Sequence, residues 1–165
     1  MLILVLTECY ANKGFAEALL ERCSQSFNLM HDETFGRDKI VKKLFRHAKK
    51  SQYKYLLGII DYEKGASRIY IEKHIIKRAF AFKSFFDNKV HVYILKYEEA
   101  IITVIVFDPM IEEVLKEADP EIMVNPKKYK HEDGERESYR IFSSNQKYNT
   151  QINMIIEFIK QYLPI

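Results

Sequence analysis

The sequence is poor in features that cross-link a chain or anchor it in a membrane. It contains only two cysteines, Cys9 and Cys23, and their spacing matches neither a metal motif nor a disulfide framework. The apolar run at the start, Leu2–Leu6, is far shorter than the ~20 residues of a membrane helix. No basic segment precedes this run, as a secretory signal would require. These absences predict a reduced, soluble, cytoplasmic protein with no membrane contact.

Three motifs of common active sites are also missing. No Gly-x-Gly-x-x-Gly follows the first apolar run, which disfavours a dinucleotide site. No Gly-Lys-Ser/Thr loop is present, which excludes a P-loop nucleotidase. The Gly-x-Ser-x-Gly turn that carries the nucleophile of α/β-hydrolases is absent as well. Any catalytic chemistry must therefore come from other residues.

The composition is that of an ordinary globular protein. The chain has 165 residues, of which 47% are hydrophobic and 30% charged, so it can bury a core without cross-links. This length predicts a single domain over residues 1–165. The net charge of +3 permits a phosphate-bearing partner but does not require one, because clustering of charge matters more than its sum.

Apolar strands alternate with amphipathic helices along the chain. Short apolar runs predict strands at Leu2–Leu6 and at residues 55–60 and 90–95. Helical spacing predicts helices after a cap at Asn12 and over residues 38–50, about 67–82 and 151–163. This alternation indicates an α/β fold, a three-layer Rossmann-like arrangement in which a mainly parallel sheet has helices on both faces.

The middle and the end of the chain are harder to interpret. Residues 100–107 are β-branched enough for a strand, but flanking acids and Asp108-Pro109 also suit two short helices. On the helical alternative, Asp108 caps a helix before Pro109. Residues 110–118 are expected to be helical. Residues 119–149 are polar and contain proline and glycine, so residues 119–165 are predicted to form an irregular segment followed by a C-terminal helix.

Acidic residues follow two of the predicted strands. Glu8 ends the first strand, while Asp61 and Glu63 end the strand over residues 55–60. Ligands of open parallel sheets bind beyond the carboxyl ends of the strands, so neighbouring strands would bring these three carboxylates together. Such a group suits Mg²⁺, or Mn²⁺ in its place, and the ion could assist phosphoryl transfer. Acids at strand ends are also common simply because loops are polar.

Two segments resemble the Toprim domain of topoisomerases, primases and some nucleases. They are Ile-Leu-Val-Leu-Thr-Glu at residues 3–8 and Leu-Gly-Ile-Ile-Asp-Tyr-Glu at residues 57–63. The resemblance implies a Toprim-like fold, a catalytic role for Glu8, and Mg²⁺ binding by Asp61 and Glu63. It also implies a helix pair around residues 97–109, introduced by acidic residues.

Two positions depart from the Toprim pattern. Cys9 stands where the family usually has glycine, and Glu63 replaces the second aspartate of the metal-binding pair. Glu98 and Glu99 are possible additional acids of the site, although acids at a helix start are also favoured by the helix dipole. Cys9 itself is interpreted as a packing residue, because neighbouring carboxylates raise the pKa of a thiol.

The predicted helix over residues 38–50 is basic on the side away from its apolar stripe. This face is either simply solvated or a surface that binds the phosphates of DNA or RNA. A second basic cluster, Lys127, Lys128, Lys130 and His131, adds some weight to the nucleic-acid interpretation. The basic residues of the helix are Lys39, Lys42, Lys43, Arg46, Lys49 and Lys50.

Three functions are compatible with these patterns. The first is Mg²⁺-dependent, nuclease-like phosphoryl transfer on DNA or RNA by the acidic site. The second is a non-catalytic nucleic-acid-binding or assembly module of the same fold. The third is a phosphorelay receiver with Asp61 as phosphoacceptor, which ranks last because Glu8 stands alone where receivers carry an acidic pair.

Overall fold

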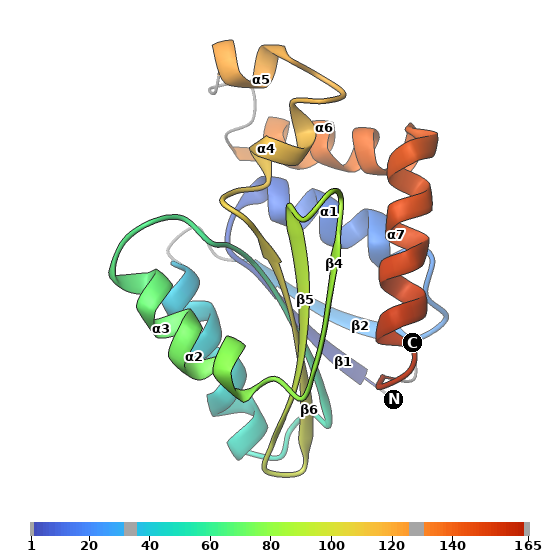
Figure 1. Ribbon diagram of the computed structural model, residues 1–165. Helices are drawn as coiled ribbons and strands as arrows, with labels where there is room; N and C mark the ends of the chain where they lie inside the picture. Colours follow the sequence, from blue (N-terminus) through green and yellow to red (C-terminus); the bar gives the residue numbers. More distant parts are fainter. Residues whose placement is uncertain (1, 32–35, 126–130, 164–165) are drawn as a thin grey trace.

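The structure is a computed structural model that describes residues 2–31, 36–125 and 131–163. Its centre is a six-stranded β-sheet (Figure 1). The strands are β1 (Leu2–Thr7), β2 (Ser26–His31), β3 (Tyr55–Asp61), β4 (Ala81–Phe85), β5 (Val90–Tyr97) and β6 (Ala100–Phe107). Their order across the sheet is β2-β1-β3-β6-β5-β4. The first four in this order run parallel, β5 is antiparallel to β6, and β4 is antiparallel to β5.

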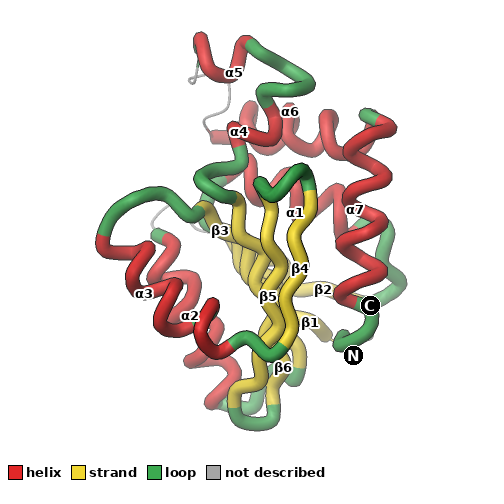
Figure 2. Tube along the Cα trace, in the orientation of Figure 1, coloured by secondary structure: helices red, strands yellow, loops and turns green. Residues whose placement is uncertain are grey.

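Helices cover both faces of this sheet (Figure 2). They are α1 (Tyr10–Leu20), α2 (Arg37–Lys49), α3 (Ala66–His74), α4 (Glu112–Leu115), α5 (Glu121–Val124), α6 (His131–Ser144) and α7 (Gln146–Ile159), with a 3₁₀ turn at Ile76–Arg78. One face packs on α2 and α3, and the other on α1, α6 and α7. The predicted fold class, an α/β mainly parallel sheet with helices on both faces, is confirmed.

The apolar runs form strands because both of their faces are covered. In β1, Ile3 and Val5 belong to the core on the α1 side, while Leu4 and Leu6 belong to the core on the α2 side. Side chains alternate between faces along a strand, so a strand buried on both sides must be apolar at every position. The strands predicted at Leu2–Leu6 and residues 55–60 follow this rule.

The sequence patterns predict neither edge strand, and both predicted helices that precede these strands are too long. The helix predicted over residues 67–82 ends at His74, and Ala81–Phe85 is instead strand β4. The helix predicted after Asn12 ends at Leu20, and a separate strand, β2, follows it. Edge strands are only partly buried and carry mixed residues. Pairing with β5 and β1 therefore decides their conformation.

Residues 100–107 form the central strand β6 and no helix pair. β6 pairs with β3 on one side and, through a tight turn at Glu98–Glu99, with β5 on the other. The helix pair implied by the Toprim resemblance around residues 97–109 is therefore wrong. The β-branched residues of this segment are buried on both faces of the sheet, which is the environment that favours them.

The segment predicted as irregular, residues 119–149, contains α5, α6 and the start of α7. Its polar composition conceals one buried stripe of α6, which includes Gly134, Ser138 and Phe142. This stripe packs on α1, where Gly14 lets the two backbones approach closely and Ser138 Oγ donates to the Ala11 carbonyl oxygen over 2.7 Å. The helix α6 is stabilised by this contact with α1, which lies far away in the sequence, so the local composition of residues 119–149 does not predict it.

Three further points concern individual segments. The cap of α1 is Cys9, whose Sγ accepts from the Asn12 N–H, and Asn12 lies buried inside the helix. Lys127, Lys128 and Lys130 lie outside the described residues.

None of the described helices is both long and apolar enough to cross a bilayer.

A candidate acidic site at the switch point of the sheet

The connections of the sheet change direction between β1 and β3. After β1 the chain crosses through α1 on one face to reach β2, and it returns through α2 on the other face to reach β3. Such a switch point leaves a crevice beyond the carboxyl ends of the two strands, where open α/β sheets bind ligands. Glu8 directly follows β1, and Asp61 is the last residue of β3.

Glu8 is tied to the end of β3 through both main chain and side chain. Its N–H donates to the Ile59 carbonyl oxygen over 3.1 Å, and its Oε2 accepts from the Asp61 N–H over 2.9 Å. Its Oε1 accepts from Arg37 Nε over 3.3 Å. Burial raises the pKa of Glu8 despite these bonds, and the Glu63 carboxylate adds to the rise. The strand order therefore brings Glu8 and Asp61 together, as the sequence analysis requires.

Asp61 is the most deeply buried acid of the group, with 6% of its surface exposed. Its Oδ1 accepts from the Ile111 N–H over 3.0 Å. Its Oδ2 accepts no hydrogen bond from the part of the chain that the structure describes. Burial raises the pKa of Asp61 well above its usual value, and the Glu8 and Glu112 carboxylates raise it further. A buried carboxyl group with a strongly raised pKa and a single hydrogen bond from the described residues is typical of a functional site.

Arg37 joins two acids of the site. It is the first residue of α2, and its Nη2 donates to Glu63 Oε2 over 2.7 Å while its Nε contacts Glu8. The Arg37 side chain is 17% exposed and that of Glu63 is 40% exposed, so Glu63 lies at the rim. The sequence analysis did not identify Arg37. Its position at the start of a basic helix offered no distinctive signal, because nothing in the local sequence places it near Glu8.

Glu112 is a fourth acid that the sequence analysis missed. It begins α4, and burial raises its pKa, with a contribution from the Glu63 carboxylate. The thiol of Cys9 also lies near these acids. Burial raises the pKa of this thiol well above the usual range, and the negative charge of Asp61 is the second cause of the rise. A thiol with such a pKa stays protonated near neutrality, which agrees with its interpretation as a packing residue.

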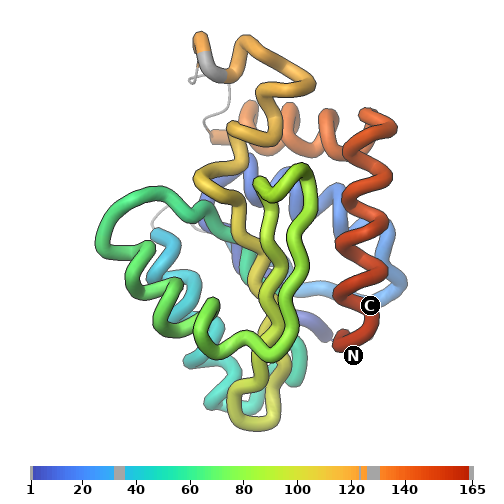
Figure 3. The backbone as a smooth tube through the Cα atoms, in the orientation of Figure 1, coloured from blue at the N-terminus to red at the C-terminus, as the bar shows by residue number. Residues whose placement is uncertain are grey.

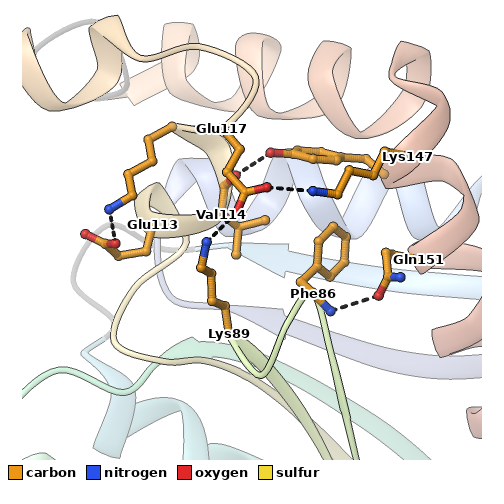
Figure 4. Close-up of polar contacts among 9 residues, drawn as sticks. Phe86, Lys89, Glu113, Val114, Glu117, Lys147 and Gln151 are labelled. Carbon is orange, nitrogen blue, oxygen red and sulfur yellow. Dashed lines mark hydrogen bonds and ion pairs between the residues drawn. The ribbon is translucent and has the colours of Figure 1, made fainter.

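Polar contacts fix α4 beside the sheet (Figure 4). Glu117 accepts from Lys89 of the β4–β5 turn and, over 2.9 Å, from Lys147 of α7. Tyr148 donates to the Val114 carbonyl oxygen. At the start of this segment, the Tyr62 N–H donates to the Phe107 and Pro109 carbonyl oxygens over 2.7 and 2.9 Å. These contacts hold the Ile111 N–H against Asp61.

The remaining acids named from the sequence do not join the site. Glu98 and Glu99 lie in the β5–β6 turn, at the end of the sheet opposite the carboxyl ends of β1 and β3. Figure 3 shows this turn at the far end of the sheet from the segment that leads to α4. Asp108 caps no helix, because α4 begins only at Glu112. Its Oδ2 instead lies 3.6 Å from Nε2 of His91.

The basic side of α2 lies on the surface, as its pattern predicts. Lys39, Lys42, Arg46, Lys49 and Lys50 are exposed and Lys43 is half-buried. Lys42 pairs with Asp38 over 3.1 Å and lies 5.1 Å from the centre of the Tyr70 ring. This face begins at Arg37, so the helix that supplies the arginine of the site also carries the basic surface.

The acids of the site suit a divalent cation by chemistry, but they are not arranged around one. Carboxylate oxygens are the ligands that Mg²⁺ prefers. Burial raises the pKa of Glu8, Asp61 and Glu112, and neighbouring carboxylates add to each rise. Within the described residues, however, no three His, Cys, Asp or Glu side chains converge as a metal site. The guanidinium of Arg37 lies between Glu8 and Glu63 instead.

Comparisons with known proteins assign no function to this site. No family model matches the chain, and no curated protein matches it. One solved structure with some likeness is the tungsten cofactor synthesizing protein MoaB from Pyrococcus furiosus, at 15% identity and a TM-score of 0.39. The match covers 76% of this chain and 94% of the MoaB chain.

Proposed function

We propose that this protein is a Mg²⁺-dependent phosphoryl-transfer enzyme, nuclease-like in its activity, that acts on phosphodiester bonds of DNA or RNA. The observation that supports it most is the meeting of Glu8 and Asp61 at the switch point of the sheet. Both carboxyls have raised pKa values because they are buried beside other acids. The same placement is what the Toprim resemblance requires of these two residues.

The proposed roles follow from burial and position. Asp61 and Glu63 would hold Mg²⁺ (or Mn²⁺), with Glu112 close by; the bound ion would neutralise charge on the phosphate. In hydrolysis, a water molecule loses a proton as its oxygen forms a new bond to phosphorus, the ester P–O bond breaks, and the leaving oxygen takes up a proton. Glu8 is the group proposed to transfer this proton, because its raised pKa brings it closer to the neutral range in which acid–base catalysis is effective.

The decisive experiment measures cleavage of labelled single- and double-stranded DNA and RNA. We expect wild-type cleavage with Mg²⁺ or Mn²⁺ and none with EDTA. Asp61→Asn should lower the rate by about 100-fold or more, since metal assistance contributes several kcal/mol and each tenfold in rate corresponds to ~1.4 kcal/mol.

Glu113→Gln is the matched control for this experiment. It also removes one carboxylate from the start of α4, but Glu113 pairs with Lys116 and not with the site, so its rate should stay close to wild type. Equal rates for wild type and Asp61→Asn would contradict the proposal.

A non-catalytic nucleic-acid-binding or assembly module is the second candidate function. The arrangement that favours it is Arg37, which already neutralises part of the charge of Glu8 and Glu63 without an ion. In that case, α2 would bind phosphates while the acidic site serves only to position the helix. Binding would then persist in EDTA and weaken steeply with salt.

Charge reversal on α2 tests the proposed nucleic-acid surface. Arg46→Glu with Lys49→Glu changes two exposed side chains and should weaken oligonucleotide binding at least tenfold, with a shallower dependence on salt, because fewer phosphates are neutralised. Fluorescence anisotropy at several salt concentrations measures both quantities.

The matched control reverses the same number of charges on the other face of the sheet. Arg136→Glu with Lys160→Glu alters exposed residues of the α6 and α7 region and gives the same net charge. If both double variants lose affinity equally, overall charge is responsible and α2 is not the contact surface.

A further inference from the structure

The guanidinium of Arg37 lies where a cation between Glu8 and Glu63 would lie. Its Nε is 3.3 Å from Glu8 Oε1, and its Nη2 is 2.7 Å from Glu63 Oε2. We propose that Arg37 is a built-in counter-ion of the acidic site, which a divalent cation displaces and which then binds a phosphate of the substrate. This inference rests on the proposed function, because it assigns Arg37 a place in the same site.

The first step of the inference is competition for the same oxygens. Oε2 of Glu8 accepts a hydrogen bond from the Asp61 N–H, so Oε1 is the oxygen of Glu8 that remains for a cation. Arg37 Nε already donates a hydrogen bond to this Oε1. Glu63 meets Arg37 through Oε2. A divalent ion that binds Glu8 through Oε1, or Glu63 through Oε2, must therefore take that oxygen from the guanidinium. Two cationic groups that need the same carboxylate oxygens bind in competition.

The second step concerns the charge of the whole group. Arg37 contributes one positive charge among four carboxyl groups, those of Glu8, Asp61, Glu63 and Glu112, and Asp61 keeps one oxygen without a hydrogen bond from the described residues. A single guanidinium therefore leaves negative charge uncompensated. A divalent ion offers twice the charge in a smaller volume, which hard oxygen ligands favour. The arginine can hold the acids together without preventing an ion from replacing it.

The third step is where a released Arg37 would act. It is the first residue of the thirteen-residue helix α2, beside Gly36, whose capping position makes no side-chain hydrogen bond. The exposed basic residues Lys39, Lys42 and Arg46 continue from it along the same helix. A guanidinium pairs well with phosphate through two parallel hydrogen bonds. The displaced side chain would thus connect the basic surface of α2 to the acidic site, as a residue that binds the substrate.

The experiment compares Arg37→Gln and Arg37→Lys with wild type in two binding measurements. Titration calorimetry with Mg²⁺ and Mn²⁺ should show at least fivefold tighter binding to Arg37→Gln, because the competing cation is gone. Anisotropy with a labelled oligonucleotide should show that Mg²⁺ raises the affinity of wild type but not that of Arg37→Gln. Arg37→Lys keeps the charge without the forked geometry and should fall between the two.

Arg46→Gln is the control, since it removes an arginine of the same helix that makes no contact with the acids; its Mg²⁺ affinity should equal that of wild type. Melting curves check that each variant is folded. Unchanged or weaker Mg²⁺ binding by both Arg37 variants would overturn the inference, even if wild type cleaves nucleic acid. Mg²⁺ binding by Arg37→Gln but not by wild type would also overturn it, because the ion would then not displace Arg37. At least fivefold tighter Mg²⁺ binding by Arg37→Gln than by a wild type that binds Mg²⁺ but cleaves no nucleic acid would support the inference and contradict the proposed function.

Discussion

Asp61→Asn is expected to raise the melting temperature of the metal-free protein at pH 7 and to remove the further rise that Mg²⁺ causes in wild type. Burial, together with Glu8 and Glu112, raises the pKa of Asp61 well above its usual value. The folded state then binds this proton more tightly than the unfolded state does, so stability falls as pH rises above the unfolded pKa of ~4. Asparagine cannot ionise, and it still offers an oxygen to the Ile111 N–H.

Melting curves at pH 4 and pH 7, with EDTA or Mg²⁺, test this expectation. In EDTA the advantage of Asp61→Asn over wild type should be present at pH 7 and largely lost at pH 4, where Asp61 is protonated in the folded state and about half protonated in the unfolded state. Mg²⁺ at 100 times its dissociation constant should stabilise wild type by ~2.7 kcal/mol. In a chain of this size each kcal/mol corresponds to roughly 2–4 °C.

Glu113→Gln serves again as the control and should keep the full response to Mg²⁺. Two results would count against the acidic site. One is an equal Mg²⁺-dependent rise in Asp61→Asn, which would place the ion elsewhere. The other is a lower melting temperature of Asp61→Asn in EDTA at pH 7, which would mean that the charged carboxylate stabilises the fold.

Gly14→Ala is expected to destabilise the protein by about 2 kcal/mol net, through the packing of α1 on α6. A Cβ atom at Gly14 would lie 2.2 Å from the Glu135 carbonyl oxygen and 2.8 Å from the Tyr139 amide nitrogen. Both atoms belong to the backbone of α6, so the helices must move apart to accept one methyl group. Overpacking of this kind costs roughly 1–3 kcal/mol or more, and the better helix propensity of alanine returns only about 1 kcal/mol.

Urea unfolding of wild type and Gly14→Ala measures this loss directly. Gly36→Ala is the matched control, because among the described residues a Cβ there meets only Asp38 Oδ1, at 3.5 Å. Gly36 caps α2, and replacing a capping residue with alanine costs roughly 1 kcal/mol or less in most helices. A loss for Gly14→Ala no larger than for Gly36→Ala would show that α1 and α6 do not pack as closely as the structure indicates.

The interior strands could be predicted because their local sequence matches their final environment. β1 and β3 are apolar at nearly every position, and both are buried on two faces. The edge strands β2 and β4 could not, because they expose part of each face and their residues suit a helix equally well. Pairing with β1 and β5 supplies the hydrogen bonds that settle their conformation. The same holds for α6, whose buried stripe has meaning only against α1.

By itself, the sequence determined that the fold is α/β and that Glu8, Asp61 and Glu63 stand at strand ends, since these properties follow from residue type and spacing. The order of the strands, which makes β1 and β3 neighbours, comes from long-range packing. Only the tertiary structure shows that Arg37 lies between Glu8 and Glu63 and that Glu112 belongs to the acidic site. It also shows that Glu98 and Glu99 lie at the opposite end of the sheet. Contacts between residues far apart in the chain depend on how whole elements pack, and no local pattern encodes them.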